Sequence, residues 1–233
     1  TMIQIIYRGS SCACFELDGS TPYYARQNYT VWVNAAERFS RDTNVFSLFG
    51  LQPDTQYTVT VRFQDGTEES VQFTTKTETC CVSVKDFGAV GDGVHEDTAA
   101  IQAAISFLPR GGRLWFPAGT YLTLPLCLKS HITLDLDQGA VILGSTQRER
   151  YPIVPAAAVD PTTGAEIPQA GFEGQELNSY QSLLHASYAE DISIVGLGAI
   201  DGNGQNGDWW RDFQSFPASR PRVIFLNRCK DVT

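Results

Sequence analysis

Two tryptophans and a run of arginines near the carboxyl end could hold a ligand. Trp209-Trp210 follow a glycine-rich loop, and paired aromatic rings there either stack on a sugar ring or pack the loop against the rest of the fold. From Trp209 to Lys230 the basic residues are Arg211, Arg220, Arg222, Arg228 and Lys230, against the single acid Asp212. This local positive charge is compatible with an anionic substrate, and scattered solvated arginines are the alternative.

Other motifs match known ligand-binding patterns only in part. Residues 202–207 have the G-x-G-x-x-G spacing of a dinucleotide-binding loop, but that loop needs a following helix within a β-α-β unit. Pro217 comes soon after it, and no alternation of strands and helices surrounds it. The histidines His95, His131 and His185 have no ligand partner at helical or turn spacing. We therefore expect no nucleotide site, no metal site and no cofactor.

The composition narrows the class of protein. A net charge of −9 argues against nonspecific binding to nucleic acid or to anionic membranes. No stretch approaches the roughly 18 apolar residues of a membrane helix. With Met2 as the native start, the apolar run after it is too short for a signal peptide, and we expect a cytoplasmic protein. The six cysteines fit no standard zinc spacing, so we expect buried free thiols.

Residues 1–78 are predicted to form a β-sandwich. In YTVWVN (29–34) and YTVTVRF (57–63) every second side chain is apolar, as in half-buried strands. The segment LQPDTQY (51–57) resembles the fibronectin type III module, in which the tyrosine bonds back to the preceding turn. We expect this module to be an architectural spacer, with Trp32 packed in its core.

One amphipathic helix is predicted in the second half of the chain. Asp97 is a good N-cap residue, and the apolar residues that follow fall on one face of a helix over residues 97–108. Strand patterns follow this helix, so it is the exception in an otherwise β-rich segment.

A faint repeat runs through that segment. SHITLDLDQGAVILG (130–144) aligns with EDISIVGLGAIDGNG (190–204), and KDVT (230–233) begins a third copy. Short β-branched strands repeated between glycine turns indicate the stacked coils of a parallel β-helix. The helix would cap its open end, so we interpret the glycine- and aspartate-rich stretch at 85–105 as a lid rather than a ligand loop.

A family resemblance supports this fold. VKDFGAVGDGVHEDTAAIQAAI, followed by GGRLWFPAGTYLT, strongly resembles the amino-terminal segment of the pectinase-type right-handed β-helices. AEDISIVGLGAIDGNGQNGDWW and RPRVIFLNRCKDVT narrow the resemblance to glycoside hydrolase family 28, the polygalacturonase family. The preceding fibronectin-like module is similar to that of the exo-acting bacterial members. The resemblance implies an all-β chain, with a sandwich over 1–78 and the first coils of a right-handed parallel β-helix over 79–233.

The resemblance also implies an activity. Family members hydrolyse α-1,4-galacturonan or its oligomers with inversion, by means of two opposed carboxyl groups. Their Asn-Thr-Asp, Asp-Asp and Gly-His-Gly segments do not occur here, and Arg228-Cys229-Lys230 fits the Arg-x-Lys segment only by its letters. The nearest carboxylate cluster is Asp201, Asp208 and Asp212, which we do not expect to replace them. No catalytic residue is assigned, and we expect an inactive amino-terminal portion of a longer enzyme.

A long proline- and glycine-rich segment, 145–181, interrupts the repeat. Loops of this length are uncommon in compact folds, and this one could close one end of a sugar-binding groove. GFEGQELNSY (171–180), which contains Glu173, resembles a stretch near the pocket wall of exo-acting relatives, and a solvated loop is the alternative. An arginine fork binds a uronate carboxylate in bidentate fashion. The candidate substrate-binding residues are Glu173, Trp209, Trp210, Arg220 and Arg222. The alternatives are a rhamnogalacturonan or xylogalacturonan hydrolase and a noncatalytic carbohydrate-binding or structural β-helix.

Overall fold

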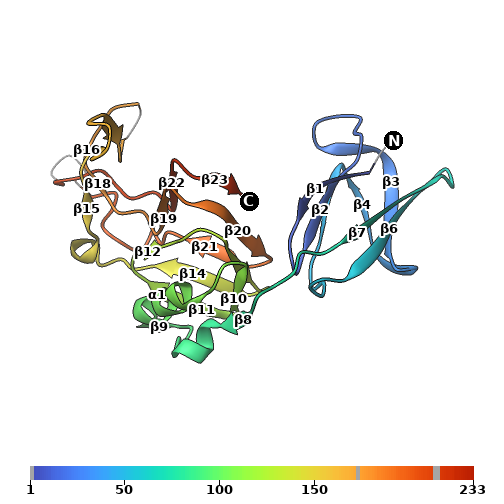
Figure 1. The fold of residues 1–233 in the computed structure, drawn as a ribbon, viewed down its shortest axis with the longest axis horizontal. Coiled ribbons are helices and arrows are strands. Elements are labelled where there is room, and N and C mark those ends of the chain that lie inside the picture. Colours follow the sequence, from blue (N-terminus) through green and yellow to red (C-terminus); the bar gives the residue numbers. More distant parts are fainter. Residues whose placement is uncertain (1–2, 172–173, 212–215) are drawn as a thin grey trace. The chain divides into compact units, whose positions relative to one another are not determined.

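The computed structural model describes residues 3–171, 174–211 and 216–233. The chain divides into two compact units, Thr1–Glu78 and Thr79–Thr233, each with its own hydrophobic core (Figure 1). Helical elements among the described residues are the α-helix α1 (Thr98–Phe107) and the short 3-10 helices η1 (Val84–Phe87) and η2 (Arg148–Arg150). None of the helices in these ranges is long and apolar enough to cross a membrane.

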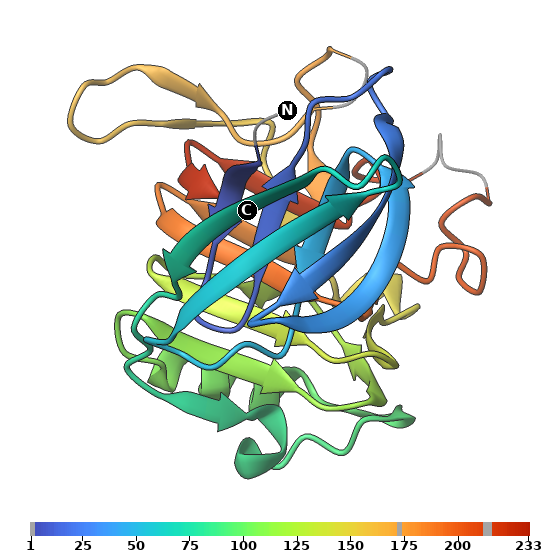
Figure 2. The ribbon, with the colours of Figure 1, turned by 90° about the vertical axis from the view of Figure 1, so that its right-hand side faces the viewer.

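The amino-terminal unit is a sandwich of two antiparallel sheets (Figure 2). The first has the order β1-β2-β5, with β1 (Gln4–Arg8), β2 (Ala13–Glu16) and β5 (Val45–Leu48). The second has the order β4-β3-β6-β7, with β3 (Tyr24–Val33), β4 (Ala36–Thr43), β6 (Gln56–Phe63) and β7 (Glu68–Thr74). The inward-facing side chains of both sheets form one core, which includes the stacked rings of Phe15 and Phe46.

Two residues of this unit test the sequence interpretation. The backbone N–H of Gln52 donates a hydrogen bond of 2.9 Å to the Tyr57 hydroxyl, so the tyrosine closes the turn as in fibronectin type III modules. The expectation that Trp32 packs in the core is wrong. Val31 and Val33 are buried on the inner face of β3, and strand alternation therefore places Trp32 on the outer face, where it is half-buried.

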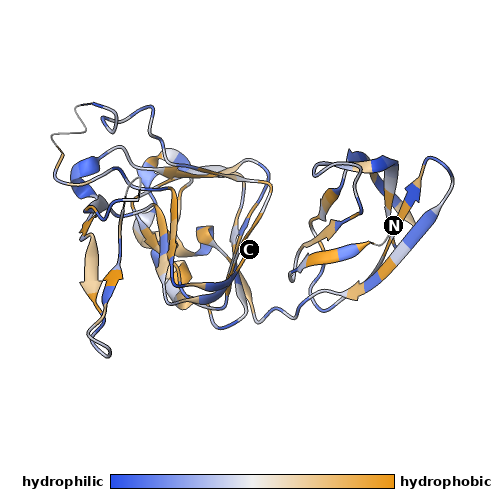
Figure 3. Cartoon of the chain, turned by 90° about the horizontal axis from the view of Figure 1, so that it is seen from above, coloured by the Kyte–Doolittle hydropathy of each residue, from blue (hydrophilic) through white to orange (hydrophobic). Residues whose placement is uncertain are grey.

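The second unit is a parallel β-helix built from three sheets. The first sheet contains β8 (Cys81–Ser83), β10 (Gly112–Phe116), β13 (Ile132–Leu136), β20 (Glu190–Gly196) and β23 (Lys230–Val232). The second contains β9 (Asp92–Glu96), β11 (Gly119–Thr123), β14 (Ala140–Gly144) and β21 (Ala199–Asp201). The third contains β12 (Leu126–Cys127), β19 (Leu184–Ser187) and β22 (Ile224–Asn227). Figure 3 shows these strands as the sides of one closed cross-section, whose interior is the apolar core.

The register of the first sheet confirms the predicted repeat. Ile132 pairs with Gly112 on one side and Ile192 on the other, and Ile192 pairs with Val232. One residue before each of the paired residues Ile132, Ile192 and Val232, the backbone is left-handed: His131, Asp191 and Asp231 have φ values of 63°, 56° and 51°. These three coils therefore share the same left-handed residue where they enter this sheet.

In the second sheet the repeat differs from the ungapped alignment. Val141 pairs with Ala199, two residues earlier than the alignment places its partner, because the connection between β20 and β21 is shorter. Gly196 makes this tight connection possible. Its φ is 110°, and a Cβ atom at that position would lie 2.0 Å from the carbonyl oxygen of Leu136 on the neighbouring coil.

Helix α1 contributes its apolar face to the first coils. Ile101, Ala104 and Ile105 are buried in the same cluster as the strand residues, so the helix covers that end of the core as predicted. Asp97 occupies the N-cap position, but its side chain makes no hydrogen bond to the helix. Its buried carboxylate instead accepts the backbone N–H groups of Val90 and Gly91, at 2.6 and 2.9 Å. The Asp97 carboxylate thus fixes the backbone of the glycine-rich stretch through these two hydrogen bonds.

The six cysteines are free, as expected, but most of them are not buried, contrary to the expectation. Cys12 is buried in the sandwich, whereas Cys81 and Cys127 are exposed and the others are intermediate. Although Cys127 is exposed as a residue, partial burial of its thiol raises the pKa of that group, so less of it is the nucleophilic thiolate at neutral pH.

Candidate functional site

The 145–181 segment is folded into small antiparallel ribbons rather than one irregular loop. One ribbon pairs β15 (Ile153–Val154) with β18 (Ser179–Tyr180). The other pairs β16 (Ala157–Val159) with β17 (Glu166–Pro168). These ribbons project from the coil between β14 and β19, and they bring residues near 156 and 178 together.

A buried aromatic cluster supports the base of these ribbons. Trp209 is only 3% exposed and meets the rings of Tyr151 and Tyr180 edge-on, at centroid distances of 5.2 and 5.5 Å. The Tyr151 hydroxyl donates to the carbonyl of Ser145 at 2.9 Å, and burial raises the pKa of Tyr151 to about 12. Trp209 therefore packs the glycine loop against the ribbons, which is the structural one of the two roles considered for it.

Arg148 connects this cluster to the neighbouring loop. Its guanidinium donates two hydrogen bonds to the Asp208 carboxylate, at 3.0 and 2.8 Å, in the bidentate geometry of a strong ion pair. These hydrogen bonds hold the pKa of Asp208 below its usual value and raise that of Arg148. The same guanidinium lies 3.7 Å from the centre of the Phe216 ring. Arg148 thus fixes a residue on each side of the undescribed stretch 212–215.

A cavity of about 490 Å³ lies between the ribbons and the 216–220 segment. We call it the ribbon cavity, and its lining includes Ala156, Glu176, Asn178, Phe216, Ser219 and Arg220. A cavity of this size, with an apolar wall and a few polar groups, is typical of small-ligand sites.

Backbone hydrogen bonds hold the walls of the ribbon cavity together. Ser219 N–H donates to the Asn178 carbonyl at 2.7 Å, and Tyr180 N–H donates to the Ser219 carbonyl at 2.9 Å. The Asn178 side chain accepts the N–H of Ala156 at 3.0 Å. The hydroxyl of Ser219 is buried and has no hydrogen-bond partner among the described residues. It is therefore a group that a bound molecule could satisfy.

Arg220 and Trp210 meet at the edge of the ribbon cavity. The Arg220 guanidinium lies 3.9 Å from the centre of the Trp210 ring, in cation–π geometry. Trp210 is 67% exposed, so the outer face of the pair is open to solvent. Of the substrate-binding residues predicted from the sequence, Trp210 and Arg220 are thus brought into contact beside the ribbon cavity.

Arg222 lies in a neighbouring depression of about 370 Å³ that shares Glu176 with the ribbon cavity. Its guanidinium donates a hydrogen bond to the carbonyl of Gly171 and lies 5.5 Å from the Phe225 ring centre. Glu173 falls outside the described residues. Glu176, three residues further on, contributes the carboxylate that lines both hollows.

The remaining polar residues considered from the sequence have structural contacts. Both oxygens of Asp208 bind Arg148, and Asp201 accepts the backbone N–H of Asn203 at 2.7 Å. Asp212 lies outside the described residues. His95 bonds Asp92 and His131 bonds Asp191, through their Nδ1 atoms. Within the described ranges, no group of three His, Cys, Asp or Glu side chains could hold a metal ion.

Several residues of the site carry no signal in the sequence. Arg148 lies in the short helix η2, whereas Asn178 and Phe216 lie in irregular stretches, and only the folded ribbons bring them to the same place. Ser219 precedes the predicted site residue Arg220 in the sequence, but only the structure shows that its hydroxyl is buried.

Comparisons with known proteins agree with this architecture. A family profile described as rhamnogalacturonase A/epimerase, pectate lyase-like, matches residues 81–158. An exo-poly-α-D-galacturonosidase of Dickeya chrysanthemi is 38% identical over 161 residues, which are 66% of this chain and 26% of that protein. A probable polygalacturonase of Vitis vinifera is 35% identical over 160 residues, 64% of this chain and 30% of that protein. The matched part is thus about a third or less of these relatives.

A solved structure extends the likeness to both units. The family 28 exopolygalacturonase of Yersinia enterocolitica superposes with a TM-score of 0.66 and 21% identity, over 100% of this chain and 53% of that one. At this identity the match shows the fold alone. The resemblance seen in the sequence is confirmed as a similarity: this chain is similar in sequence to polygalacturonases over about two thirds of its length, and it shares the fold of a family 28 exopolygalacturonase, with a fibronectin type III-like module ahead of a pectate lyase-like β-helix.

Proposed function

We propose that this protein is a polygalacturonase-type glycoside hydrolase that acts on α-1,4-galacturonan or oligogalacturonides, from the chain end and with inversion. The kinship with a Dickeya exo-poly-α-D-galacturonosidase supports the substrate class. The observation that carries the proposal for this chain is the ribbon cavity, with Arg220 stacked on Trp210 at its edge.

The chemistry of the ribbon cavity suits an acidic sugar. A galacturonide has a carboxylate, which a guanidinium can bind through two parallel hydrogen bonds. Its ring also has an apolar face, which can lie against the exposed indole of Trp210. Asn178 and Ser219 add polar groups that can meet sugar hydroxyls. The ribbons stand between consecutive coils, where they can close a groove and favour binding of a chain end.

The test compares charged and neutral substrates in the full-length protein. Arg220→Ala should raise KM for trigalacturonate about tenfold or more, since a charge-assisted hydrogen bond contributes roughly 1.5–3 kcal/mol. Arg222→Ala should act in the same direction. Arg228→Ala is the matched control, because Arg228 is exposed on the same unit and lies over Tyr188 instead. Equal effects of all three variants would contradict the proposal.

A rhamnogalacturonan hydrolase is the second candidate. The description of the matching family profile, rhamnogalacturonase A/epimerase, favours it. The two candidates differ in product, so incubation of the full-length protein with polygalacturonate and with rhamnogalacturonan distinguishes them. Release of galacturonic acid from polygalacturonate alone supports the first candidate.

A further inference from the structure

The outer face of the four-stranded sheet carries an indole ring that the core does not use. Trp32 on β3 faces away from the sandwich interior and is half-buried among outward-facing residues of β4 and β6. Hydroxyl side chains surround it, including the pairs Thr30–Ser40 at 3.2 Å and Thr60–Ser70 at 2.7 Å. This face therefore combines one large flat apolar ring with polar groups that both donate and accept hydrogen bonds.

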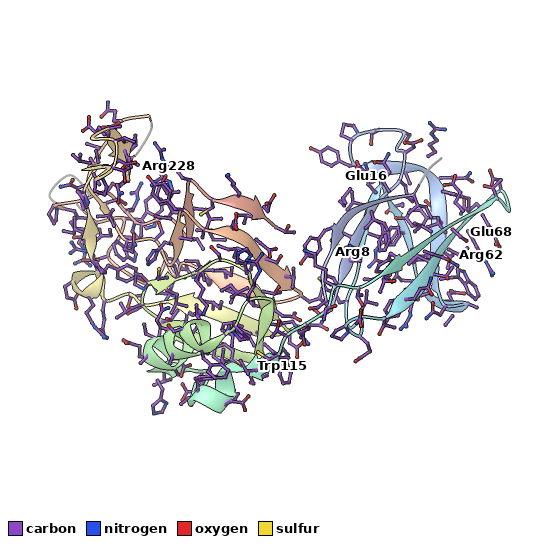
Figure 4. All side chains as sticks on the ribbon, viewed as in Figure 1. Arg8, Glu16, Arg62, Glu68, Trp115 and Arg228 are labelled. Carbon is purple, nitrogen blue, oxygen red and sulfur yellow. The ribbon has the colours of Figure 1, made fainter. Side chains whose placement is uncertain are left out.

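Arg62 covers this ring. Its guanidinium lies 4.0 Å from the ring centre, and its Nε donates to Glu68 at 2.7 Å. Figure 4 shows Arg62 and Glu68 next to each other at the side of the amino-terminal unit. The two side chains are 43% and 50% exposed. An ion pair this exposed adds little stability, so the guanidinium can shift away from the ring at small cost.

Beneath this cover, the indole N–H finds no acceptor in the part of the chain that the structure describes. The Nε1 atom of Trp32 is shielded from solvent and makes no hydrogen bond to any described residue. Buried tryptophan N–H groups normally find a partner, and leaving one unpaired is unfavourable. A group that brings an oxygen acceptor to this atom would remove that penalty.

A cavity of about 330 Å³ lies at this place. Its lining includes Asn28, Thr30, Trp32, Glu37, Ser40, Arg62 and Gln64. The indole is thus surrounded by two amides, two hydroxyls, one carboxylate and one guanidinium. The guanidinium already has an acidic partner in Glu68.

We propose that this cavity, the Trp32 site, binds a neutral sugar ring of a polysaccharide. The apolar face of the sugar packs on the indole as Arg62 shifts aside, and a sugar hydroxyl accepts the Trp32 N–H. Charge selects a neutral ligand over an acidic one. Glu37 and Glu68 outnumber Arg62 at the site, and residues 1–78 contain nine acidic residues against six basic ones. The unit is then a binding module as well as a spacer, independently of the proposed hydrolase function.

Affinity electrophoresis of the complete 233-residue chain tests this inference. The gels contain soluble β-1,4-galactan, α-1,5-arabinan or β-glucan as neutral probes, and polygalacturonate as the acidic probe. At least one neutral gel should retard the wild-type chain, and Trp32→Ala should lower that affinity about tenfold or more. Tyr23→Ala is the control, since Tyr23 is an exposed aromatic residue of the same unit. It should migrate like wild type.

Two further measurements keep the test independent of folding. Trp32→Phe retains a ring but not the N–H donor, so it should bind with intermediate affinity. In the wild-type chain labelled with ¹⁵N, the retarding polysaccharide's oligomers should shift the Trp32 indole N–H resonance, which Trp32→Phe identifies by its loss. The proposal is wrong if none of the three neutral gels retards the chain, or if Trp32→Ala and Trp32→Phe bind as wild type does.

Discussion

Replacing Asp97 should loosen the first coil of the β-helix without touching the ribbon cavity. The Asp97 side chain is 2% exposed, and its two oxygens accept the N–H groups of Val90 and Gly91. In Asp97→Ala both donors lose their acceptor inside the protein. The helix itself loses nothing, because the side chain makes no capping hydrogen bond to it.

The magnitude follows from the two hydrogen bonds. A hydrogen bond to a charged acceptor contributes roughly 1.5–3 kcal/mol. Two such bonds give about 3–6 kcal/mol for Asp97→Ala, with the lower end applying if the loop opens to water. Asp97→Asn keeps one acceptor oxygen but turns an NH₂ group toward the other donor, so it should cost about half as much.

Urea unfolding and amide hydrogen exchange measure this effect. Asp97→Ala should shift the unfolding midpoint of the β-helix unit and abolish protection at the amides of Val90 and Gly91. Asp137→Ala, at an exposed position of the same unit, is the control and should change neither. If Asp97→Ala costs less than about 1 kcal/mol, or if both amides stay protected, the carboxylate does not hold this loop.

Three further predictions concern the coil and the ribbons. Trp209→Ala should destabilise the β-helix unit by roughly 3–5 kcal/mol, as measured by denaturation, whereas Trp210→Ala, at an exposed ring, should leave stability unchanged. The hydrogen bonds from Arg148 hold the pKa of Asp208 below its usual value, so the stability that this pair adds is present at neutral pH. It should be lost as the pH falls below about 4, and the loss should be absent in Asp208→Asn; an unchanged acid transition would contradict it. Gly196→Ala should lower the melting temperature sharply, since the added Cβ meets a carbonyl oxygen at 2.0 Å.

Much of the fold could be predicted because its signals are local. Period-two strands, the apolar face of the helix and the repeat between 130–144 and 190–204 each depend on neighbouring residues. Even the outward position of Trp32 follows from alternation with Val31 and Val33, and the expectation of a core position failed because it treated the aromatic type as stronger evidence than the period. The two-residue offset in the second sheet depends on one glycine turn, which an ungapped alignment cannot detect.

The candidate site was less accessible to sequence reasoning. Trp210 and Arg220 stand out by residue type, but their stacking depends on how the 216–220 segment folds back. Arg148 and Asp208 form an ion pair although they are 60 positions apart, and no rule of sequence spacing predicts that pairing. The ribbons of the 145–181 segment are very short strands, two or three residues each, which carry no periodic pattern.

The central claim, that the ribbon cavity binds an acidic saccharide, is tested most directly by calorimetric titration of trigalacturonate into the protein. The account predicts binding to the wild-type protein and to Arg228→Ala, and a tenfold or greater loss in Arg220→Ala. It predicts no binding of maltotriose, a neutral trisaccharide, to a Trp32→Ala variant, which keeps the ribbon cavity but lacks the proposed neutral-sugar site. Binding of trigalacturonate with the same affinity in Arg220→Ala as in wild type would contradict it.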